Sequence, residues 1–128
     1  MKVRCTSERL SDADERRFTE LYLLPEHRPN WTFDVRKNEE YPVVALEIAR
    51  GEAWVLLPAP IPRARWAPLS LFEVIDSEIQ EGWGVYPKEH GLGIWWPCLN
   101  DPFFLDDVDE CVEEALREYA RIVRLSGG

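Results

Sequence analysis

An amphipathic stripe near the C-terminus is the feature that most constrains the fold. Its apolar residues recur at helical spacing and would share one face of a single long helix. They are Leu105, Val108, Val112, Ala115, Leu116, Tyr119, Ile122 and Val123. Asp106 could cap this helix at its start, and Gly127-Gly128 could end it. Because such a stripe must be buried against another layer, the helix needs a sheet to pack on.

Several β-prone runs earlier in the chain would supply that sheet. Residues 41–49 and 52–57 flank Arg50-Gly51, where Gly51 can take the positive φ of a tight turn, and so predict a hairpin. Alternation of apolar and polar residues predicts a strand over 31–36. Further strands are expected from about 70 to 76, near 83–86 and over 91–96, with a turn at KEHG between the last two. The segment 70–80 also fits a helix, since Ser70 and Glu73 match a capping box.

The remaining segments complete the expected architecture. Ser11 and Asp14 begin a helix that Pro25 and Pro29 should end. Residues 58–68 carry four prolines and predict an extended surface connector, because proline removes ladder donors. We therefore expect a single α+β domain over residues 1–128, since 128 residues fit one domain. It would have a mostly antiparallel sheet of about five strands, with an N-terminal and a long C-terminal helix packed on it.

The net charge of −9 is confined to one half of the chain. Residues 1–70 carry 11 basic and 11 acidic groups, whereas residues 71–128 carry 4 basic and 13 acidic groups. An acidic half could steer a basic partner protein onto itself. The same acids could instead only solvate a helix start, where the helix dipole favours them. The acidic excess excludes direct nucleic-acid binding, which needs clustered Lys and Arg, and argues against an anionic membrane surface.

The expected cellular compartment of the protein is judged from targeting signals and from the cysteines. The N-terminal residues contain no apolar signal region, and no stretch approaches the roughly 20 apolar residues of a membrane span. Cys5, Cys98 and Cys111 are an odd number without close pairing, and we expect them to stay reduced. Buried, inert thiols are expected at Cys98 and Cys111. These features predict a cytoplasmic protein.

No residue pattern in the sequence assigns a catalytic, cofactor-binding or metal-binding role. His27 and His90 sit in expected loops, where surface positions are the simpler interpretation. His90, Cys98 and Cys111 lack the close spacing of zinc ligands. With 24 acidic residues, carboxylate pairs are too numerous to identify a glycoside hydrolase. We expect no cofactor, and a non-enzymatic role is favoured.

Six tryptophans are the remaining signal. Trp31 and Trp54 fall on expected strand faces and should be core residues. Trp95 and Trp96 should point to opposite faces of one strand. Trp66 follows Arg63 and Arg65 and would form a small basic and aromatic spot. Trp83 lies between glycines and is the best candidate for an exposed ring.

Residues 70–125 carry a resemblance to a known class of proteins. It depends on the segment Phe72 to Trp83 (FEVIDSEIQEGW), the GLGIWWP run and the acidic C-terminal helix. In these features the chain resembles small bacterial immunity-type proteins, which inhibit toxins. The resemblance implies a non-catalytic inhibitor whose acidic surface covers a basic active site. It implies no role for any individual residue.

Two hypotheses of different classes follow. The first is an acidic interaction module that binds a basic surface on another protein, such as a toxin or a nucleic-acid enzyme, through residues of the acidic, Trp-bearing half. Its candidate contact residues are Trp83, Trp96, Asp106, Asp107, Asp109 and Glu110. The alternative is a small-molecule or carbohydrate-binding domain with a Trp-lined pocket between sheet and connector. A hydrolase using two carboxylates with raised pKa values is a third, weaker possibility.

Overall fold

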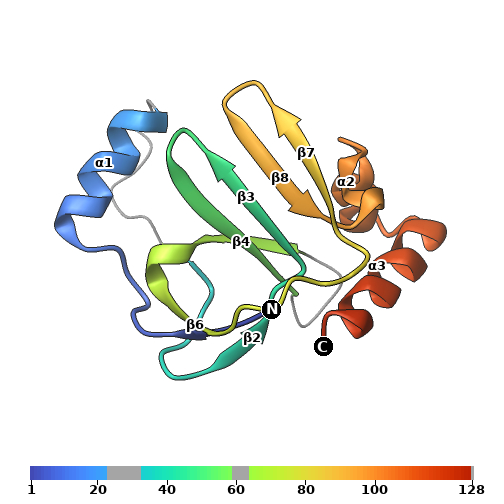
Figure 1. Cartoon of the computed structure of the whole chain (residues 1–128), viewed down its shortest axis with the longest axis horizontal. Coiled ribbons are helices and arrows are strands. Elements are labelled where there is room, and N and C mark those ends of the chain that lie inside the picture. The colour runs from blue at the N-terminus through green and yellow to red at the C-terminus, as the bar shows by residue number, and fades with distance from the viewer. Residues whose placement is uncertain (23–32, 59–63, 128) are drawn as a thin grey trace.

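The computed structural model describes residues 1–22, 33–58 and 64–127, which form strands, α-helices and short 3-10 helices (Figure 1). The strands are β1 (Lys2–Cys5), β2 (Glu40–Pro42), β3 (Ala45–Ala49), β4 (Glu52–Pro58), β5 (Ala64–Pro68), β6 (Phe72–Asp76), β7 (Gly84–Lys88) and β8 (Gly91–Trp95). The helices are α1 (Asp12–Tyr22), η2 (Leu69–Leu71), η3 (Pro97–Asn100), α2 (Phe104–Asp109) and α3 (Glu113–Leu125). The prediction of an α+β fold with antiparallel sheet is confirmed.

The strands divide between two antiparallel sheets rather than one. The larger sheet has the order β5-β4-β3-β8-β7, and the smaller has the order β2-β1-β6. The predicted hairpin is present as β3 and β4, with Ala49 opposite Glu52. Its first strand is shorter than the predicted 41–49, because residues 41–42 belong to β2 of the smaller sheet and 43–44 form no strand. Its turn residues Arg50 and Gly51 both have positive φ, at 54° and 81°, as a two-residue hairpin turn requires. The N–H of Arg50 donates to the carbonyl oxygen of His90 at 2.9 Å, which ties this turn to the predicted turn between β7 and β8.

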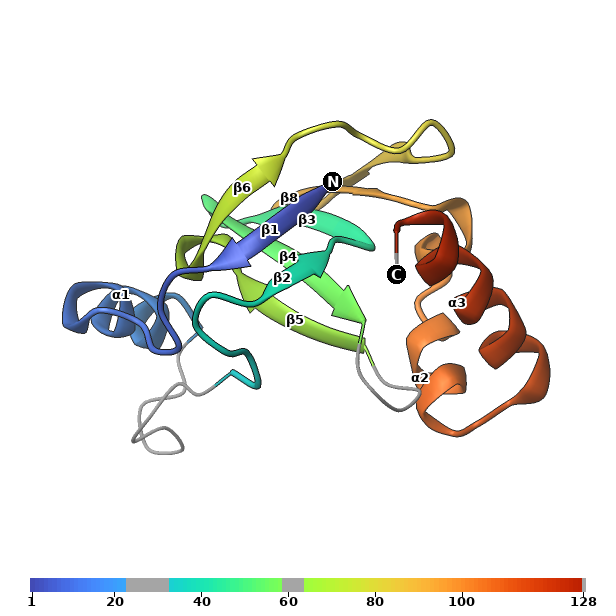
Figure 2. The same cartoon turned by 90° about the horizontal axis from the view of Figure 1, so that it is seen from below.

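Two apolar clusters hold the layers together, one on each face of the larger sheet. Figure 2 shows the smaller sheet on one side of the larger sheet and α2 and α3 on the other. The inter-sheet cluster joins β4 to the smaller sheet and includes Val3, Val43 and Val55. The helix-side cluster joins β4 and β8 to α2 and α3 and includes Leu56 and Ile122. Val55 and Leu56 are neighbours in β4, so the alternation of side chains along one strand feeds both clusters.

The N-terminal helix begins as its sequence predicts. The backbone N–H of Asp14 donates to Oγ of Ser11 at 3.1 Å and so caps the start of α1. Phe18 is buried on α1 and stacks on Trp54 of β4, with ring centroids 5.4 Å apart. This contact holds α1 at the edge of the inter-sheet cluster. The strand β1 was not expected, because its alternation of Lys2, Val3, Arg4 and Cys5 is only four residues long.

The prediction of a single long C-terminal helix is wrong, because the helix is interrupted between α2 and α3. Cys111 adopts the left-handed conformation with φ of 60°. Each helix therefore sets its own face toward the sheet: Val108 is 0% exposed, whereas Val112 from the same sequence stripe is 42% exposed. The expected cap is also wrong, since Phe103 precedes α2 and Asp106 lies within its first turn.

The prediction of a connector over 58–68 is corrected by β5. Residues 64–68 pair with β4, with Trp66 opposite Leu56, and β4 itself extends to Pro58. The strand tolerates Pro68 because β5 is at the edge of the sheet, where a missing N–H costs little, and because Pro68 is its last residue. Residues 59–63, with Pro60 and Pro62, lie outside the described residues.

The strand predicted over 31–36 is also wrong for the residues that the structure describes. Residues 33–36 form no strand, and the N–H of Val35 donates to the carbonyl oxygen of Phe33 at 2.9 Å in a tight local bend. Val35 is nevertheless buried in the inter-sheet cluster, which accounts for the apolar pattern. Trp31 and Thr32 lie outside the described residues.

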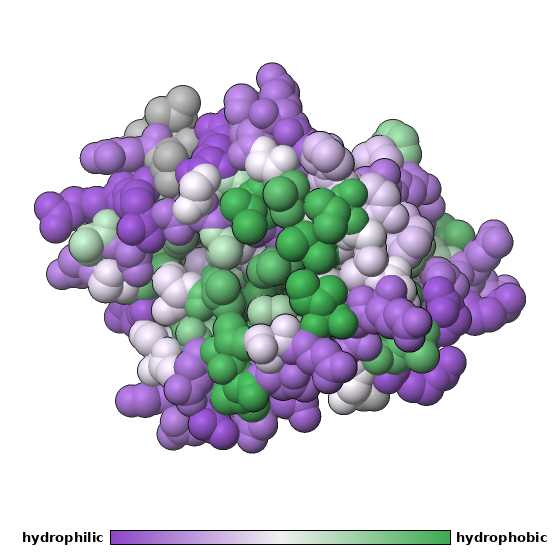
Figure 3. All heavy atoms as spheres, viewed as in Figure 1, coloured by the Kyte–Doolittle hydropathy of each residue, from purple (hydrophilic) through white to green (hydrophobic). Residues whose placement is uncertain are grey.

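Strands β6, β7 and β8 lie where the sequence predicts them, and 72–76 is strand rather than helix. No helix in the described part of the chain is long and apolar enough to cross a membrane. Figure 3 shows an apolar surface in the middle of the face seen in Figure 1, where the larger sheet is not covered by helices. Exposed apolar side chains on this sheet include Ile48 and Val85.

Candidate functional site

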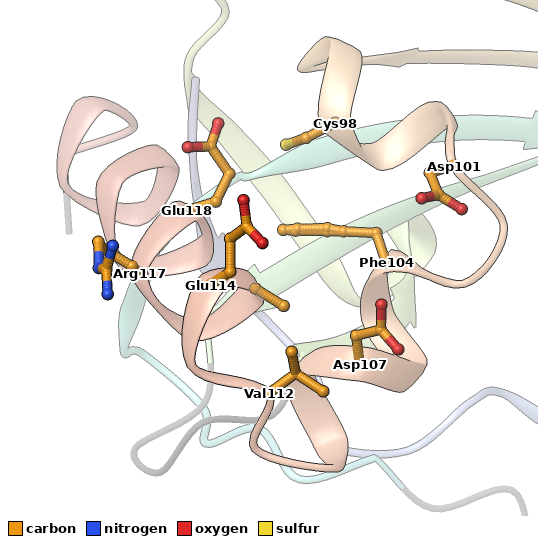
Figure 4. A pocket seen from close by; sticks show the side chains of 9 residues that line it. Cys98, Asp101, Phe104, Asp107, Val112, Glu114, Arg117 and Glu118 are labelled. Carbon is orange, nitrogen blue, oxygen red and sulfur yellow. The ribbon is translucent and has the colours of Figure 1, made fainter.

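A groove of about 550 Å³ lies between η3, α2 and α3 (Figure 4). We call it the acidic groove. Its lining residues are Cys98, Asp101, Phe104, Asp107, Val112, Glu114, Ala115, Arg117 and Glu118. Four of these carry carboxylates and one carries a guanidinium. The break at Cys111 creates the groove, because it lets α3 turn back beside α2 instead of extending it.

Two carboxylates of α3 line this groove. Glu114 and Glu118 are one helical turn apart. The carboxylate of Glu114 points toward Phe104, whereas that of Glu118 points along α3 (Figure 4). The side chain of Arg117 points away from them. Its Nη2 lies 3.0 Å from Oε1 of Glu113, outside the groove lining. The charge facing into the groove is therefore negative.

Glu118 is held in its ionised form by Arg121. Nη2 and Nε of Arg121 donate to its two carboxylate oxygens at 2.6 and 3.0 Å, a bidentate pair. These hydrogen bonds lower the pKa of Glu118 below its ordinary value. The guanidinium of Arg121 also lies 6.0 Å from the ring centroid of Trp96, which positions it against the helix-side cluster.

Cys98 forms part of the groove floor but is not an activated nucleophile. Burial, with a smaller contribution from the negative charge of Glu118, raises the pKa of its thiol to about 11. A thiol with that pKa stays protonated at neutral pH, and the thiolate is the reactive form. Of the two thiols expected to be buried, Cys98 is only half-buried and Cys111 is exposed, so the prediction of burial is wrong at Cys111.

The predicted acidic contact residues divide between two places. Asp107 lines the acidic groove, whereas Asp106, Asp109 and Glu110 are exposed and lie outside its lining. The candidate list did not contain the other three carboxylates of the lining, which are Asp101, Glu114 and Glu118. Two of them are separated by four residues on one helix, a spacing that could have marked a shared face.

The two predicted tryptophan contacts are less exposed than expected. Trp83 is half-buried and packs against both apolar clusters. Trp96 is buried, and its Nε1 donates to Oγ of Ser126 at 3.3 Å. Ser126 in turn donates to the carbonyl oxygen of Ile122 at 2.7 Å. Trp96 thus fastens the end of α3 to the sheet.

The other tryptophans serve the core. Trp95 and Trp96 belong to the same helix-side cluster, so the prediction of opposite faces is wrong. The strand ends at Trp95, and the backbone of Trp96 turns into η3. Trp66 packs edge-on against Trp95, with centroids 6.3 Å apart. Trp54 packs against the inter-sheet cluster as expected, and Arg63 lies outside the described residues.

Two other hollows are formed by described residues, and neither is lined by tryptophan. One lies along α1 between Asp12 and Glu20, and the other lies at the turns of the two hairpins and includes Arg50 and His90. His90 is exposed, with Nε2 3.9 Å from Oε1 of Glu89, and His27 lies outside the described residues. These two hollows do not match the Trp-lined pocket of the alternative hypothesis.

Metal-binding geometry is also absent from residues 1–22, 33–58 and 64–127. No three His, Cys, Asp or Glu side chains in these segments gather closely enough to hold a metal ion. Comparison of the chain with protein-family models, with curated proteins and with solved structures finds no match. The functional argument therefore depends on the geometry of the acidic groove.

Proposed function

We propose that this protein is a non-enzymatic interaction module whose acidic groove binds a basic surface of a partner protein. The observation that carries the proposal is the imbalance of charge in the groove lining, where four carboxylates face one guanidinium. That guanidinium belongs to Arg117, which is paired with Glu113 and points away. Arg121, from outside the lining, neutralises Glu118 alone, so the lining keeps an excess of negative charge. A Lys or Arg side chain of a partner would supply the missing positive charge.

The groove has the chemical character that such a side chain requires. Val112 and Cys98 offer apolar surface for the methylene stem, while the carboxylate of Glu114, which points into the groove, offers acceptors for the charged end. Each partly exposed ion pair contributes only about 0.2–1 kcal/mol. Four carboxylates acting together would mainly raise the rate of association with a basic partner.

A toxin or a nucleic-acid enzyme is the partner class that this proposal favours. Such enzymes present basic surfaces to phosphates, and clustered carboxylates can occupy the same surface in place of phosphates. The resemblance of residues 70–125 to immunity-type inhibitors supports this form of the proposal. The protein would then block the partner by covering its basic site, without a chemical step of its own.

The alternatives receive less support. A carbohydrate-binding domain would expose a tryptophan ring in a hollow, and a panel of sugars tested by tryptophan fluorescence should leave the emission unchanged. A hydrolase with paired acids would need a carboxyl group with a raised pKa. In the groove, the pKa of Glu118 is instead lowered by Arg121.

The test compares two triple variants of equal charge change. The groove variant is D107N/E114Q/E118Q, and the matched control is D106N/D109N/E110Q, whose residues lie outside the groove lining. A partner is first isolated from the native host by affinity capture and identified by mass, and its association rate is then measured at several salt concentrations.

The groove variant should lower the association rate at low salt by about tenfold and flatten its salt dependence, because the attracting charges are gone. The control should have a clearly smaller effect. Equal effects of the two variants would mean that only the overall charge matters. A larger effect of the control would move the contact to the exposed acids of α2 and contradict the groove.

A further inference from the structure

The two sheets separate toward one side and leave apolar side chains uncovered. Register places Ala67, Val55, Leu46, Ile94 and Val85 in one row across the larger sheet, on the face that meets the smaller sheet. Val55 is 0% exposed, whereas Val85 at the end of the row is 63% exposed. The cover that the smaller sheet provides is therefore lost toward β8 and β7.

The smaller sheet shows the same loss of cover. Val3 of β1 lies directly opposite Val74 of β6, so both point to the same face of that sheet. Val3 is 0% exposed in the inter-sheet cluster, but Val74 is 42% exposed. Among the described strands, β6 is also the last of its sheet, so one side of its backbone pairs with none of them.

We call these uncovered apolar residues of the two sheets the open wedge. It consists of Leu46, Ile48, Val85 and Ile94 from the larger sheet and Val74 from β6. Figure 3 shows apolar side chains continuing down the middle of this face. None of the wedge residues lines the acidic groove.

We propose that an extended segment of a partner protein adds as a strand to β6 and fills the open wedge. A fourth strand beside β6 would continue the smaller sheet over the uncovered part of β8 and β7. Its alternate side chains would be apolar and face Val85 and Ile94, as in other cases of strand addition. Its remaining residues would be basic.

Charge complementarity selects a basic segment. The stretch from Phe72 to Trp83 carries four acids, Glu73, Asp76, Glu78 and Glu81, and no basic residue. Of these, Glu73 is paired with Arg4, whose Nη1 lies 2.8 Å from its Oε1. The rim along β6 therefore attracts Lys and Arg. A second copy of the chain would bring the same acids against one another, and the net charge of −9 further opposes that pairing.

The other free edge nearby is less suited to strand addition. The hairpin of β7 and β8 closes at Lys88 and Gly91, which form a hydrogen-bonded pair. Hydrogen-bonded and non-hydrogen-bonded pairs alternate from there, so Pro87 opposite Leu92 and Val85 opposite Ile94 are non-hydrogen-bonded pairs. The backbone N and carbonyl groups of Pro87 and Val85 therefore point away from β8. Pro87 therefore faces outward without an N–H to donate. β6 contains no proline. Strand addition is thus directed to β6.

The probe is the synthetic peptide KKVTVTVKK, which alternates apolar and polar residues between basic ends. Its binding to the full chain is measured by calorimetry, and amide hydrogen exchange of β6 is followed with and without peptide. Two control peptides separate the contributions. KKVTPTVKK cannot complete the strand hydrogen bonds, and EEVTVTVEE reverses the charge.

Substitutions in the chain locate the binding surface. V85D and V74D place a charge in the open wedge, and L125D is the matched control, because Leu125 is 47% exposed at the end of α3. The groove variant D107N/E114Q/E118Q serves as a second control, since a basic peptide could also bind there. Urea denaturation establishes that each variant is folded.

We expect KKVTVTVKK to bind, to slow exchange in β6, and to lose about tenfold in affinity with V85D or V74D. L125D and the groove variant should retain most of the binding. No saturable binding, unchanged exchange in β6, or equal binding of either control peptide overturns the proposal. If sedimentation showed a dimer that V85D dissociates, the open wedge would instead bind a second copy of the chain. Vesicle binding abolished by V85D would assign it to a lipid surface. Loss of binding only in the groove variant would refute the wedge while leaving the acidic groove supported.

Discussion

Replacing Cys111 by glycine should stabilise the protein, although glycine within a helix destabilises. Cys111 has φ of 60°, and its side chain is exposed. An L residue in the left-handed region costs about 1–2 kcal/mol relative to its preferred conformation. Glycine avoids that cost but loses about 0.5–1 kcal/mol through the greater entropy of its unfolded backbone. We therefore expect C111G to be more stable than C111A by about 0.5–1 kcal/mol.

The alanine variant is the proper reference, because it removes the thiol and its weak contact with the carbonyl oxygen of Asp109 at 4.0 Å but keeps the strained backbone. Ala120 supplies the opposite control. It is exposed in the interior of α3, where A120G should cost about 1 kcal/mol. The same change from alanine to glycine is thus expected to have opposite signs at two positions nine residues apart.

Urea denaturation in a reducing buffer measures these differences as shifts of the midpoint at constant slope. If C111G were less stable than C111A, residue 111 would not have a left-handed backbone. The long continuous helix indicated by the apolar stripe would then be correct. The acidic groove would lose its structural basis, since it depends on the turn between α2 and α3.

Four further predictions concern the groove and the residues that support it. A thiol reagent at pH 8 should modify the exposed Cys111 much faster than the half-buried Cys98, and equal rates in the folded protein would contradict the raised pKa of Cys98. Folding raises the pKa of Cys98 from 9.0 to about 11. The contribution of its thiol to the free energy of unfolding is therefore complete below pH 9 and declines as the pH rises toward 11. C98A should weaken this decline, measured as denaturation midpoints at alkaline pH. A Cβ at Gly82 would overlap the ring of Trp96, so G82A should lower the free energy of unfolding by about 1–3 kcal/mol, and an unchanged midpoint would refute the close packing. Because the pKa of Glu118 is lowered in the folded protein, its ionised carboxylate stabilises the fold above the ordinary carboxyl pKa. That contribution is lost as the pH falls through the lowered pKa. E118Q should therefore make the free energy of unfolding less sensitive to acid, measured from pH 7 downward.

Local sequence patterns were sufficient where one element could be judged by itself. Ser11 and Asp14 predicted the start of α1, and Arg50-Gly51 predicted the hairpin turn, because caps and tight turns depend on residues close together in the chain. The strand at 91–95 was also recognisable from its apolar run, whereas the strand at 72–76 was favoured over a helix that the same residues also fit. The acidic excess of residues 71–128 was visible in composition alone.

Patterns failed where partners distant in sequence decided the outcome. The apolar stripe from Leu105 to Val123 fits one helix or two, and helical spacing alone does not register a left-handed residue at Cys111. The prolines of 58–68 suggested a connector, but pairing of β5 with β4 provides hydrogen bonds that no local pattern shows. Trp83 between two glycines suggested exposure, yet the ring packs against both clusters.

By itself the sequence determined the α+β class, the position of most strands and the half of the chain that carries the net charge, because these depend on composition and short periodicities. Only the tertiary structure divided the strands between two sheets, and only it brought Asp101, Asp107, Glu114 and Glu118 to one groove. It also left Val74 and Val85 uncovered on facing sheets. The physical reason is the same in each case: a groove or an open edge is made by elements that meet in space, and their meeting depends on which faces are buried together.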